Sequence, residues 1–99
     1  MHAHINNTTI AETDDTIEIE GNQYFPPESV KKQYLEDSDT PYTCPWKGET
    51  QYFHITIDES TYEDAAWSYP DPKDGATDRV GSDFSGYVAF DADVAVEKR

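Results

Sequence analysis

The chain has 99 residues and a mass of 11.2 kDa, which allows one domain with one small hydrophobic core. Its 21 acidic residues against 7 basic ones give a formal net charge of −14. This charge excludes nucleic acid and anionic membranes as expected partners, because binding to either needs a positive protein face. The mean hydropathy is −0.86, yet 13% of the residues are aromatic, which is too many for a disordered tail. We therefore expect a folded acidic domain.

The acidic residues are spread along the chain and are not gathered in a terminal block. Such a surface repels itself, and screening shortens the repulsion from ~8 Å at physiological ionic strength to ~3 Å at 1 M salt. We infer the cytoplasm of a halophile that accumulates salt; the alternative is an acidic protein of an ordinary cytoplasm. The single cysteine, Cys44, excludes an intrachain disulfide and fits a reducing compartment. Apolar runs are short, so neither a signal peptide nor a membrane helix is expected.

Short extended segments separated by turn residues recur along the whole chain. In chain order, strands are predicted at 3–5, 8–11, 16–20, 50–57, 65–69, 86–90 and 94–96. A short helix is predicted at 27–32, where a proline and an acid stand in the first turn, and a single helical turn at 76–79. The polar segment 36–40 predicts a turn. The pattern indicates a mainly β domain of short antiparallel strands with one or two short helices, and no helix is long enough for a parallel crossover.

The segment Thr43-Cys44-Pro45-Trp46-Lys47-Gly48 carries the most reactive side chains. Pro45 favours an extended Cys44, and Gly48 permits a turn directly after Lys47. An ammonium beside a thiol stabilises the thiolate, which is the nucleophilic form, so Cys44 and Lys47 are the candidate catalytic residues. The alternative is that Cys44 is a small buried hydrophobic residue within a structural turn.

The chain has more large aromatic side chains than so small a core needs. Rings with polar tips commonly line ligand pockets, and over their faces they can hold a cation. The alternative is ordinary core packing, because tyrosine and tryptophan are usually mostly buried. The candidate ligand-binding residues are Tyr24, Phe25, Trp46, Trp67 and Tyr69, with Tyr87 as a further aromatic residue of this group.

Histidines and paired aspartates are the candidate metal ligands of the chain. His2 and His4 fall on one face of a strand, and His54 could be a third ligand or a general base. Structural zinc sites usually have four ligands, so no metal ligand and no cofactor is predicted. The Asp-x-Asp pairs at 37–39 and 91–93 could chelate Mg²⁺, but no glycine-rich phosphate loop accompanies them, which favours solvated surface.

Several blocks of sequence, in this order, carry a family likeness. They are Asp14-Asp15-Thr16, Glu20-Gly21-Asn22-Gln23-Tyr24-Phe25-Pro26-Pro27-Glu28-Ser29-Val30, Ser38-Asp39-Thr40, Thr43 to Gly48, Asp64-Ala65-Ala66-Trp67-Ser68-Tyr69-Pro70 and Gly86-Tyr87-Val88-Ala89-Phe90. Together they resemble the family catalogued as domain of unknown function 427, over nearly the whole chain. The resemblance implies a single domain over residues 1–99, with a fold similar to β-tent domains, in which two antiparallel sheets lean together over a pocket. The family is also catalogued as nucleotidyltransferase-like, so the resemblance implies nucleotide transfer as a candidate activity. Many tent domains hold zinc with two cysteine pairs, and this chain departs from them because it has only Cys44.

The leading hypothesis is a domain that binds a small molecule in an aromatic pocket bordered by Cys44 and Lys47, with or without catalysis. The alternatives are a protein-interaction module with an exposed aromatic face and a metal-dependent nucleotidyltransferase. A concavity near Trp46 and Trp67 favours the first, and a flat exposed aromatic patch favours the second. The third needs carboxylates that converge on one cation. The oligomeric state is left open.

Overall fold

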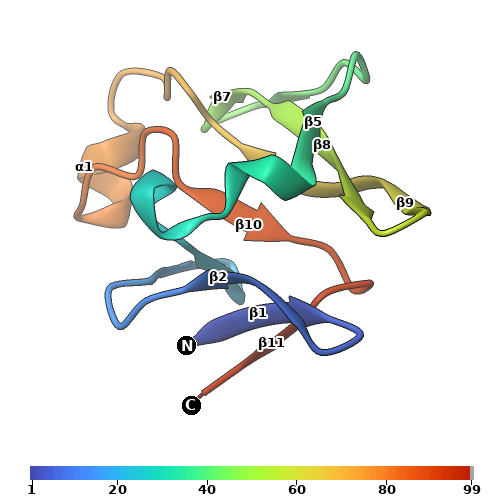
Figure 1. Cartoon of the computed structure of the whole chain (residues 1–99). Helices are drawn as coiled ribbons and strands as arrows, with labels where there is room; N and C mark the ends of the chain where they lie inside the picture. Colours follow the sequence, from blue (N-terminus) through green and yellow to red (C-terminus); the bar gives the residue numbers. More distant parts are fainter. Residues whose placement is uncertain (99) are drawn as a thin grey trace.

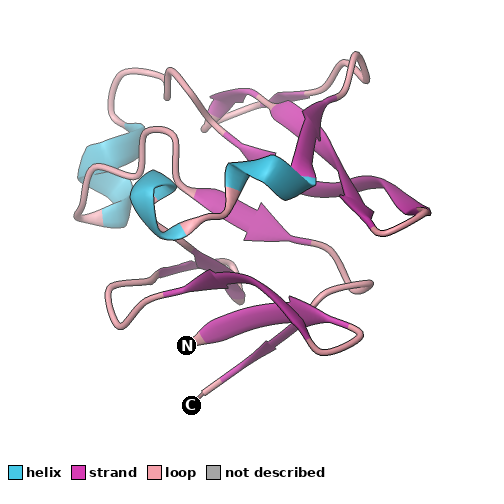
Figure 2. Cartoon of the chain, in the orientation of Figure 1, coloured by secondary structure: helices cyan, strands magenta, loops and turns pink. Residues whose placement is uncertain are grey.

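The computed structural model describes residues 1–98 and is built mainly from short antiparallel strands (Figures 1 and 2). The strands are β1 (His2–Ile5), β2 (Thr8–Glu12), β3 (Ile17–Ile19), β4 (Asn22–Tyr24), β5 (Leu35–Asp37), β6 (Thr43–Cys44), β7 (Gly48–Glu49), β8 (Gln51–Ile57), β9 (Ser60–Ser68), β10 (Val88–Phe90) and β11 (Ala95–Glu97). The helices are two 3₁₀ turns, η1 (Pro27–Ser29) and η2 (Lys32–Tyr34), and one short α-helix, α1 (Ala76–Val80). The predicted mainly β fold with short helices is confirmed.

Two larger sheets form the body of the domain. One has the order β11-β1-β2 and brings both ends of the described chain together, because His2 pairs with Glu97. The other has the order β10-β9-β8-β5, and its two longest strands, β8 and β9, form a hairpin. Figure 1 shows the first sheet lying below β10. The hairpins β3-β4 and β6-β7 are small additional sheets at the side.

The structure departs from the predicted elements where tertiary pairing overrides local pattern. The segment 36–40 is predicted as a turn, but its first two residues belong to strand β5. This strand pairs with β8, where Leu35 lies opposite Ile55. Polar residues are tolerated there because β5 is an edge strand with exposed side chains at Glu36 and Asp37. Strand β9 is also longer than predicted and begins at Ser60.

The interior is divided into two clusters of buried side chains. The aliphatic core, between the two larger sheets, contains Ala3, Ile5, Ile10, Ala11, Phe25, Val30, Ile55, Ile57, Ala65, Ala66, Val88, Phe90 and Val94. The aromatic core contains Ile19, Tyr24, Cys44, Tyr69, Ala76, Phe84 and Ala89. Neighbouring residues at the end of β4 divide between them, since Tyr24 enters the aromatic core and Phe25 the aliphatic one. Side chains that alternate along an extended chain produce this division.

Candidate functional site

A cavity of about 270 Å³, here called the Lys47 pocket, opens beside the aromatic core. Its walls come from β4, the β6-β7 hairpin, β8, β9 and the residues that follow β9 and β10. The lining residues are Asn22, Tyr24, Lys47, Tyr52, Asp64, Trp67, Tyr69 and Asp91. Four of the lining residues are aromatic and four are polar or charged, so the pocket is smaller and more polar than a typical ligand pocket.

Lys47 is the buried cation of this pocket, with 8% of its side chain exposed. Its ammonium forms an ion pair with the exposed carboxylate of Glu20 and lies 4.9 Å from the ring centroid of Trp46 and 5.3 Å from that of Tyr69. Burial acts to lower the pKa of Lys47, but the hydrogen bond to Glu20 and the nearby tyrosines outweigh it and raise the pKa. Lys47 therefore stays protonated at neutral pH.

The hairpin that carries Lys47 is fixed by the chain segment 71–73. The amide of Lys73 donates to the carbonyl of Lys47 at 2.9 Å, and the Lys73 ammonium donates to the carbonyl of Pro45 at 3.0 Å. Gly48 has a φ of +115°, and a Cβ there would lie 3.3 Å from the carbonyl oxygen of Asp71. The turn therefore needs glycine both for its backbone conformation and for this close approach.

Hydroxyl and indole groups form the polar part of the aromatic wall. Trp67 Nε1 donates to the Tyr24 hydroxyl at 3.1 Å, and the Tyr24 and Tyr69 rings stack with centroids 6.4 Å apart. Burial raises the pKa of both tyrosines, so their hydroxyls remain neutral donors. Tyr52 and Trp67 are cross-strand partners on β8 and β9, and their ring centroids lie 6.5 Å apart.

Two carboxylates, Asp64 and Asp91, also line the pocket. Asp64 accepts hydrogen bonds from Ser38 at 2.5 Å and Thr40 at 2.8 Å, which lower its pKa and keep it ionised. Its φ of +50° lies in the left-handed region, beside the register shift between β8 and β9. Asp91 follows β10, and its amide donates to the Ala65 carbonyl at 2.8 Å. Because Glu20 already balances Lys47, Asp64 and Asp91 add negative charge to the pocket, and the histidine near them is His54, whose Nδ1 lies 3.7 Å from Asp64 Oδ1.

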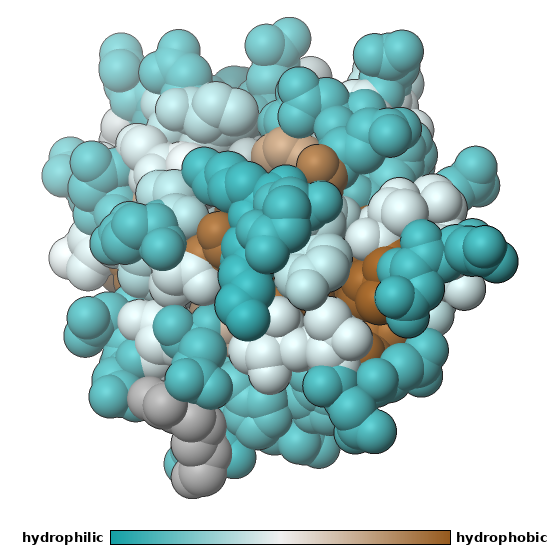
Figure 3. Space-filling view, in the orientation of Figure 1, coloured by the Kyte–Doolittle hydropathy of each residue, from teal (hydrophilic) through white to brown (hydrophobic). Residues whose placement is uncertain are grey.

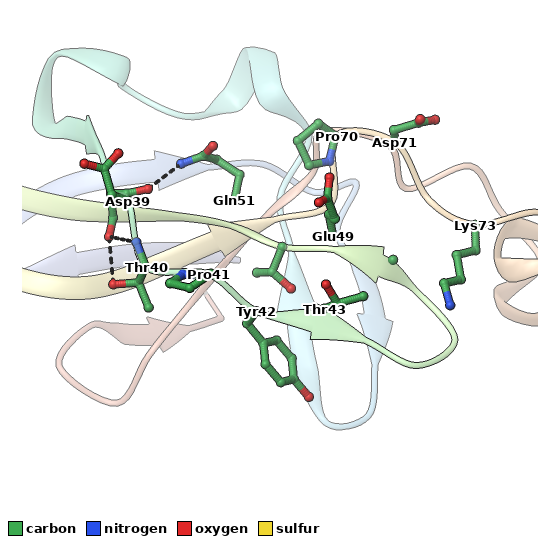
Figure 4. A pocket seen from close by; sticks show the side chains of 13 residues that line it. Asp39, Thr40, Pro41, Tyr42, Thr43, Glu49, Gln51, Pro70, Asp71 and Lys73 are labelled. Atoms are coloured by element: carbon green, nitrogen blue, oxygen red, sulfur yellow. Dashed lines mark hydrogen bonds between the residues drawn. The ribbon is translucent and has the colours of Figure 1, made fainter.

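A second, larger depression, here called the outer groove, has a volume of about 620 Å³. It is lined by residues 38–43, 48–51, 70–71 and 73, which come mostly from loops (Figure 4). Tyr42, 51% exposed, stands at this groove and is the one exposed large hydrophobic residue in the described part of the chain. None of the aromatic residues proposed from the sequence lines it, so the Lys47 pocket is the better candidate site.

The sequence profile of the family described as Domain of unknown function (DUF427), with the label NTP_transf_9, matches residues 1–98. The chain belongs to this family. The resemblance inferred from the sequence blocks is therefore confirmed, and the DUF427 domain accounts for nearly all of the chain. A search of curated proteins gave no match. No helix among residues 1–98 of this DUF427 domain is long and apolar enough to cross a membrane.

The DUF427 fold brings four of the predicted residues to the Lys47 pocket and leaves three outside it. Tyr24, Lys47, Trp67 and Tyr69 line the pocket, whereas Phe25, Trp46 and Cys44 do not. Phe25 is fully buried in the aliphatic core, where its ring centroid lies 5.4 Å from that of Phe90. It therefore cannot touch a ligand in the Lys47 pocket. The alternation of side chains after Tyr24 is the physical reason.

Trp46 and Cys44 support Lys47 from behind the pocket. The Trp46 ring contacts both the Lys47 ammonium and the Arg79 guanidinium, whose carbon is 4.4 Å from the ring centroid. The cation-binding role expected for this ring is therefore filled by the domain's own cations. Cys44 is 6% exposed and packs in the aromatic core, which agrees with its interpretation as a small buried hydrophobic residue. In the hairpin it pairs with Gly48, the residue that lies close to the carbonyl of Asp71.

Four lining residues were not proposed from the sequence: Asn22, Tyr52, Asp64 and Asp91. Tyr52 could have been found, because it lies on the same face of the clearly alternating segment 50–57 as His54, in register with a candidate tryptophan. Asp91 was considered only as part of an Asp-x-Asp pair that could chelate Mg²⁺, and Asp64 could not be singled out among 21 acidic residues. Their place depends on the irregular register between β8 and β9 and on the end of β10.

Proposed function

We propose that this DUF427 domain binds a small polar organic molecule in the Lys47 pocket. The observation that carries the proposal is a buried, protonated lysine that faces the same cavity as two carboxylates and a wall of aromatic rings. Burying an ammonium costs free energy, and a fold that needed only a core would do better with an apolar residue at this position. Binding of a ligand by this ammonium would explain why a lysine occupies the buried position.

The charges of the pocket favour a ligand with a protonated amino group. Asp64 and Asp91 supply acceptors for such a group, and the faces of Tyr52 and Trp67 supply the aromatic surface over which a cation is stabilised. Lys47 and the tyrosine hydroxyls of the pocket supply donors for an oxygen atom of the ligand. We therefore propose an amine that also carries a hydroxyl, carbonyl or carboxylate oxygen.

A matched set of three phenols tests this proposal: tyramine, 4-ethylphenol and 3-(4-hydroxyphenyl)propionate. They share a ring and differ in the charge of the side arm. We expect tyramine to shift the indole N–H resonance of Trp67 at lower concentration than the other two, because Asp64 and Asp91 attract its ammonium. A set of other small amines extends the test, and no shift of this resonance with any amine contradicts the proposal.

The substitutions Asp91→Asn and Asp93→Asn form a matched pair. Both residues are exposed and stand in the turn after β10, but only Asp91 lines the pocket. We expect Asp91→Asn to weaken tyramine binding about fivefold, since an exposed ion pair contributes up to about 1 kcal/mol, and Asp93→Asn to leave it unchanged. Equal effects of the two changes would mean that tyramine responds only to the overall negative charge.

The distribution of exposed residues supports a pocket over a flat aromatic interaction surface, because Tyr42 is the one exposed large hydrophobic residue among residues 1–98. The face in Figure 3 is covered mostly by hydrophilic residues, with only small hydrophobic spots. The label of the family refers to nucleotide transfer, but the two carboxylates of the proposed pocket belong to no group of three His, Cys, Asp or Glu side chains among residues 1–98 that could share an ion. We therefore place simple binding before transfer. We also propose that the domain works in the cytoplasm at high salt, which the acidic surface supports.

A further inference from the structure

Two histidines and one glutamate meet on the sheet β11-β1-β2, outside the Lys47 pocket. His2 and His4 are two residues apart on β1, so their side chains project from one face of the sheet. Their rings stack with centroids 4.8 Å apart and an interplanar angle of 17°. The strand thus presents two imidazoles side by side.

Glu97 completes the cluster from the neighbouring strand, where it pairs directly with His2. Its Oε2 atom lies 3.1 Å from Nε2 of His4 and 4.0 Å from Nε2 of His2. One ligand atom from each of the three side chains falls within 4.8 Å of the others. Within residues 1–98, this is the one group of three such side chains that could share an ion.

These distances are close to those that a bound ion requires. Zinc binds nitrogen and oxygen at about 2.0–2.2 Å in a tetrahedral arrangement, which sets its ligand atoms about 3.3–3.5 Å apart. The observed separations of 3.1 Å and 4.0 Å stand on either side of that spacing. Nδ1 of His2 is buried without a hydrogen-bond partner among the described residues, so no bond at that nitrogen opposes a small rotation of the ring.

We propose that His2, His4 and Glu97 bind one divalent transition-metal ion of the Zn²⁺ class. Imidazole and carboxylate together suit zinc, nickel and copper, whereas magnesium and calcium prefer sites made of oxygen alone. The side chains are 24%, 25% and 61% exposed, so water can complete the coordination. An ion here joins the last strand of the domain to the first.

Zinc titration of the purified domain tests the site, with excess Mg²⁺ present to saturate the surface carboxylates. We expect one Zn²⁺ per chain, and Co²⁺ in its place to give the visible absorption of a site with nitrogen ligands. His4→Gln and Glu97→Gln should each weaken Zn²⁺ binding at least tenfold. His54→Gln is the matched control, since the third histidine lies elsewhere and accepts a hydrogen bond from the Asp64 amide.

Several results would overturn the proposal. If His4→Gln binds Zn²⁺ as tightly as the wild type, the ion is held by the amino terminus with His2 or by scattered carboxylates. Equal losses in His54→Gln would likewise remove the assignment. Zn²⁺ should also raise the thermal unfolding midpoint of the wild type, and a rise of the same size in Glu97→Gln contradicts a bond to that carboxylate. Tyramine binding should be unaffected by His4→Gln and Glu97→Gln, because neither residue lines the Lys47 pocket.

Discussion

The aliphatic core and the aromatic core lie side by side but are made in different ways. The aliphatic core is formed mostly by apolar residues that alternate on the longer strands, and it contains no charged group. The aromatic core is assembled beside the buried Lys47 from short strands (β3, β4, β6 and β10), two loop residues and α1. The first follows from the period of a strand, whereas the second depends on where turns bring distant segments together.

Because the two cores differ in this way, substitutions in them should affect different properties of the domain. A residue of the aliphatic core packs in a cluster of apolar side chains, so its substitution should act mainly on the free energy of unfolding. A residue beside Lys47 holds hydrogen bonds, charges and the wall of a cavity at once. Substitutions there should change ligand binding out of proportion to their effect on stability.

The largest expected effect is that of Phe25→Ala. Phe25 is fully buried in the aliphatic core, and we expect this truncation to lower the free energy of unfolding by about 3–5 kcal/mol. The measurement is urea denaturation. Phe25→Leu keeps most of the volume and serves as the folded control, in which tyramine binding should equal that of the wild type. If Phe25→Leu lost tyramine binding while keeping its stability, Phe25 would have to be counted among the ligand-binding residues.

Salt should stabilise both cores together, because it acts on the surface that encloses them. If each of the 14 unbalanced charges costs roughly 0.2 kcal/mol at low salt, the sum is about 3 kcal/mol. We expect the unfolding midpoint to rise by roughly 10–20 °C between 0.1 M and 3 M KCl. The difference between wild type and Phe25→Leu should stay constant. A midpoint independent of KCl would contradict the proposed halophilic character.

The ion pair in the aromatic core should respond asymmetrically to the loss of either partner. Glu20→Gln leaves the buried ammonium of Lys47 without its counter-ion and should cost about 1–3 kcal/mol. Lys47→Met returns an exposed carboxylate to water and should change stability by less than about 1 kcal/mol. Chemical denaturation at pH 7 compares the two. Equal losses of stability in the two variants would show that an unpaired Glu20 carboxylate is as costly as an unpaired Lys47 ammonium, which contradicts the prediction.

The same pair has a pH dependence with a definite sign. The pKa of Lys47 in the folded domain is raised above its ordinary value of 10.5, so the pair contributes fully below that pH. Its contribution disappears as pH rises through the folded-state pKa. Stability measured from pH 8 to 11 should therefore fall more in the wild type than in Lys47→Met.

Much of the fold could be predicted from the sequence, because the strands of the aliphatic core keep their alternation. The segment 50–57 coincides with β8 to within one residue, and the helical turn at 76–79 lies within α1. The pocket was predicted only in part. Its tyrosines and Lys47 were visible as residue types, but no local pattern gives the register shift that places Asp64 or the turn that places Asp91.

A smaller effect is expected from Asp64 at acid pH. Hydrogen bonds from Ser38 and Thr40 lower its pKa below the ordinary 3.8. Its contribution is therefore present above that pH and is lost as pH falls through the folded-state pKa. Asp64→Asn should lose less stability than the wild type between pH 5 and 3, as followed by thermal unfolding. Asp83→Asn is a useful comparison, because hydrogen bonds from Ser85 lower the pKa of that carboxylate in the same way and Asp83 does not line the pocket.

The smallest expected signal is the alkylation of Cys44 in the native domain. The thiol is 6% exposed and belongs to the aromatic core, so iodoacetamide should reach it much more slowly than it reaches the unfolded chain. Mass spectrometry across pH 6 to 9, with and without urea, gives both rates. Rapid labelling of the native protein would mean that the β6-β7 hairpin opens beside Lys47. Cys44 would then regain its place as a candidate nucleophile. Protection in native buffer would instead leave Lys47 as the one reactive group of this hairpin that faces the pocket.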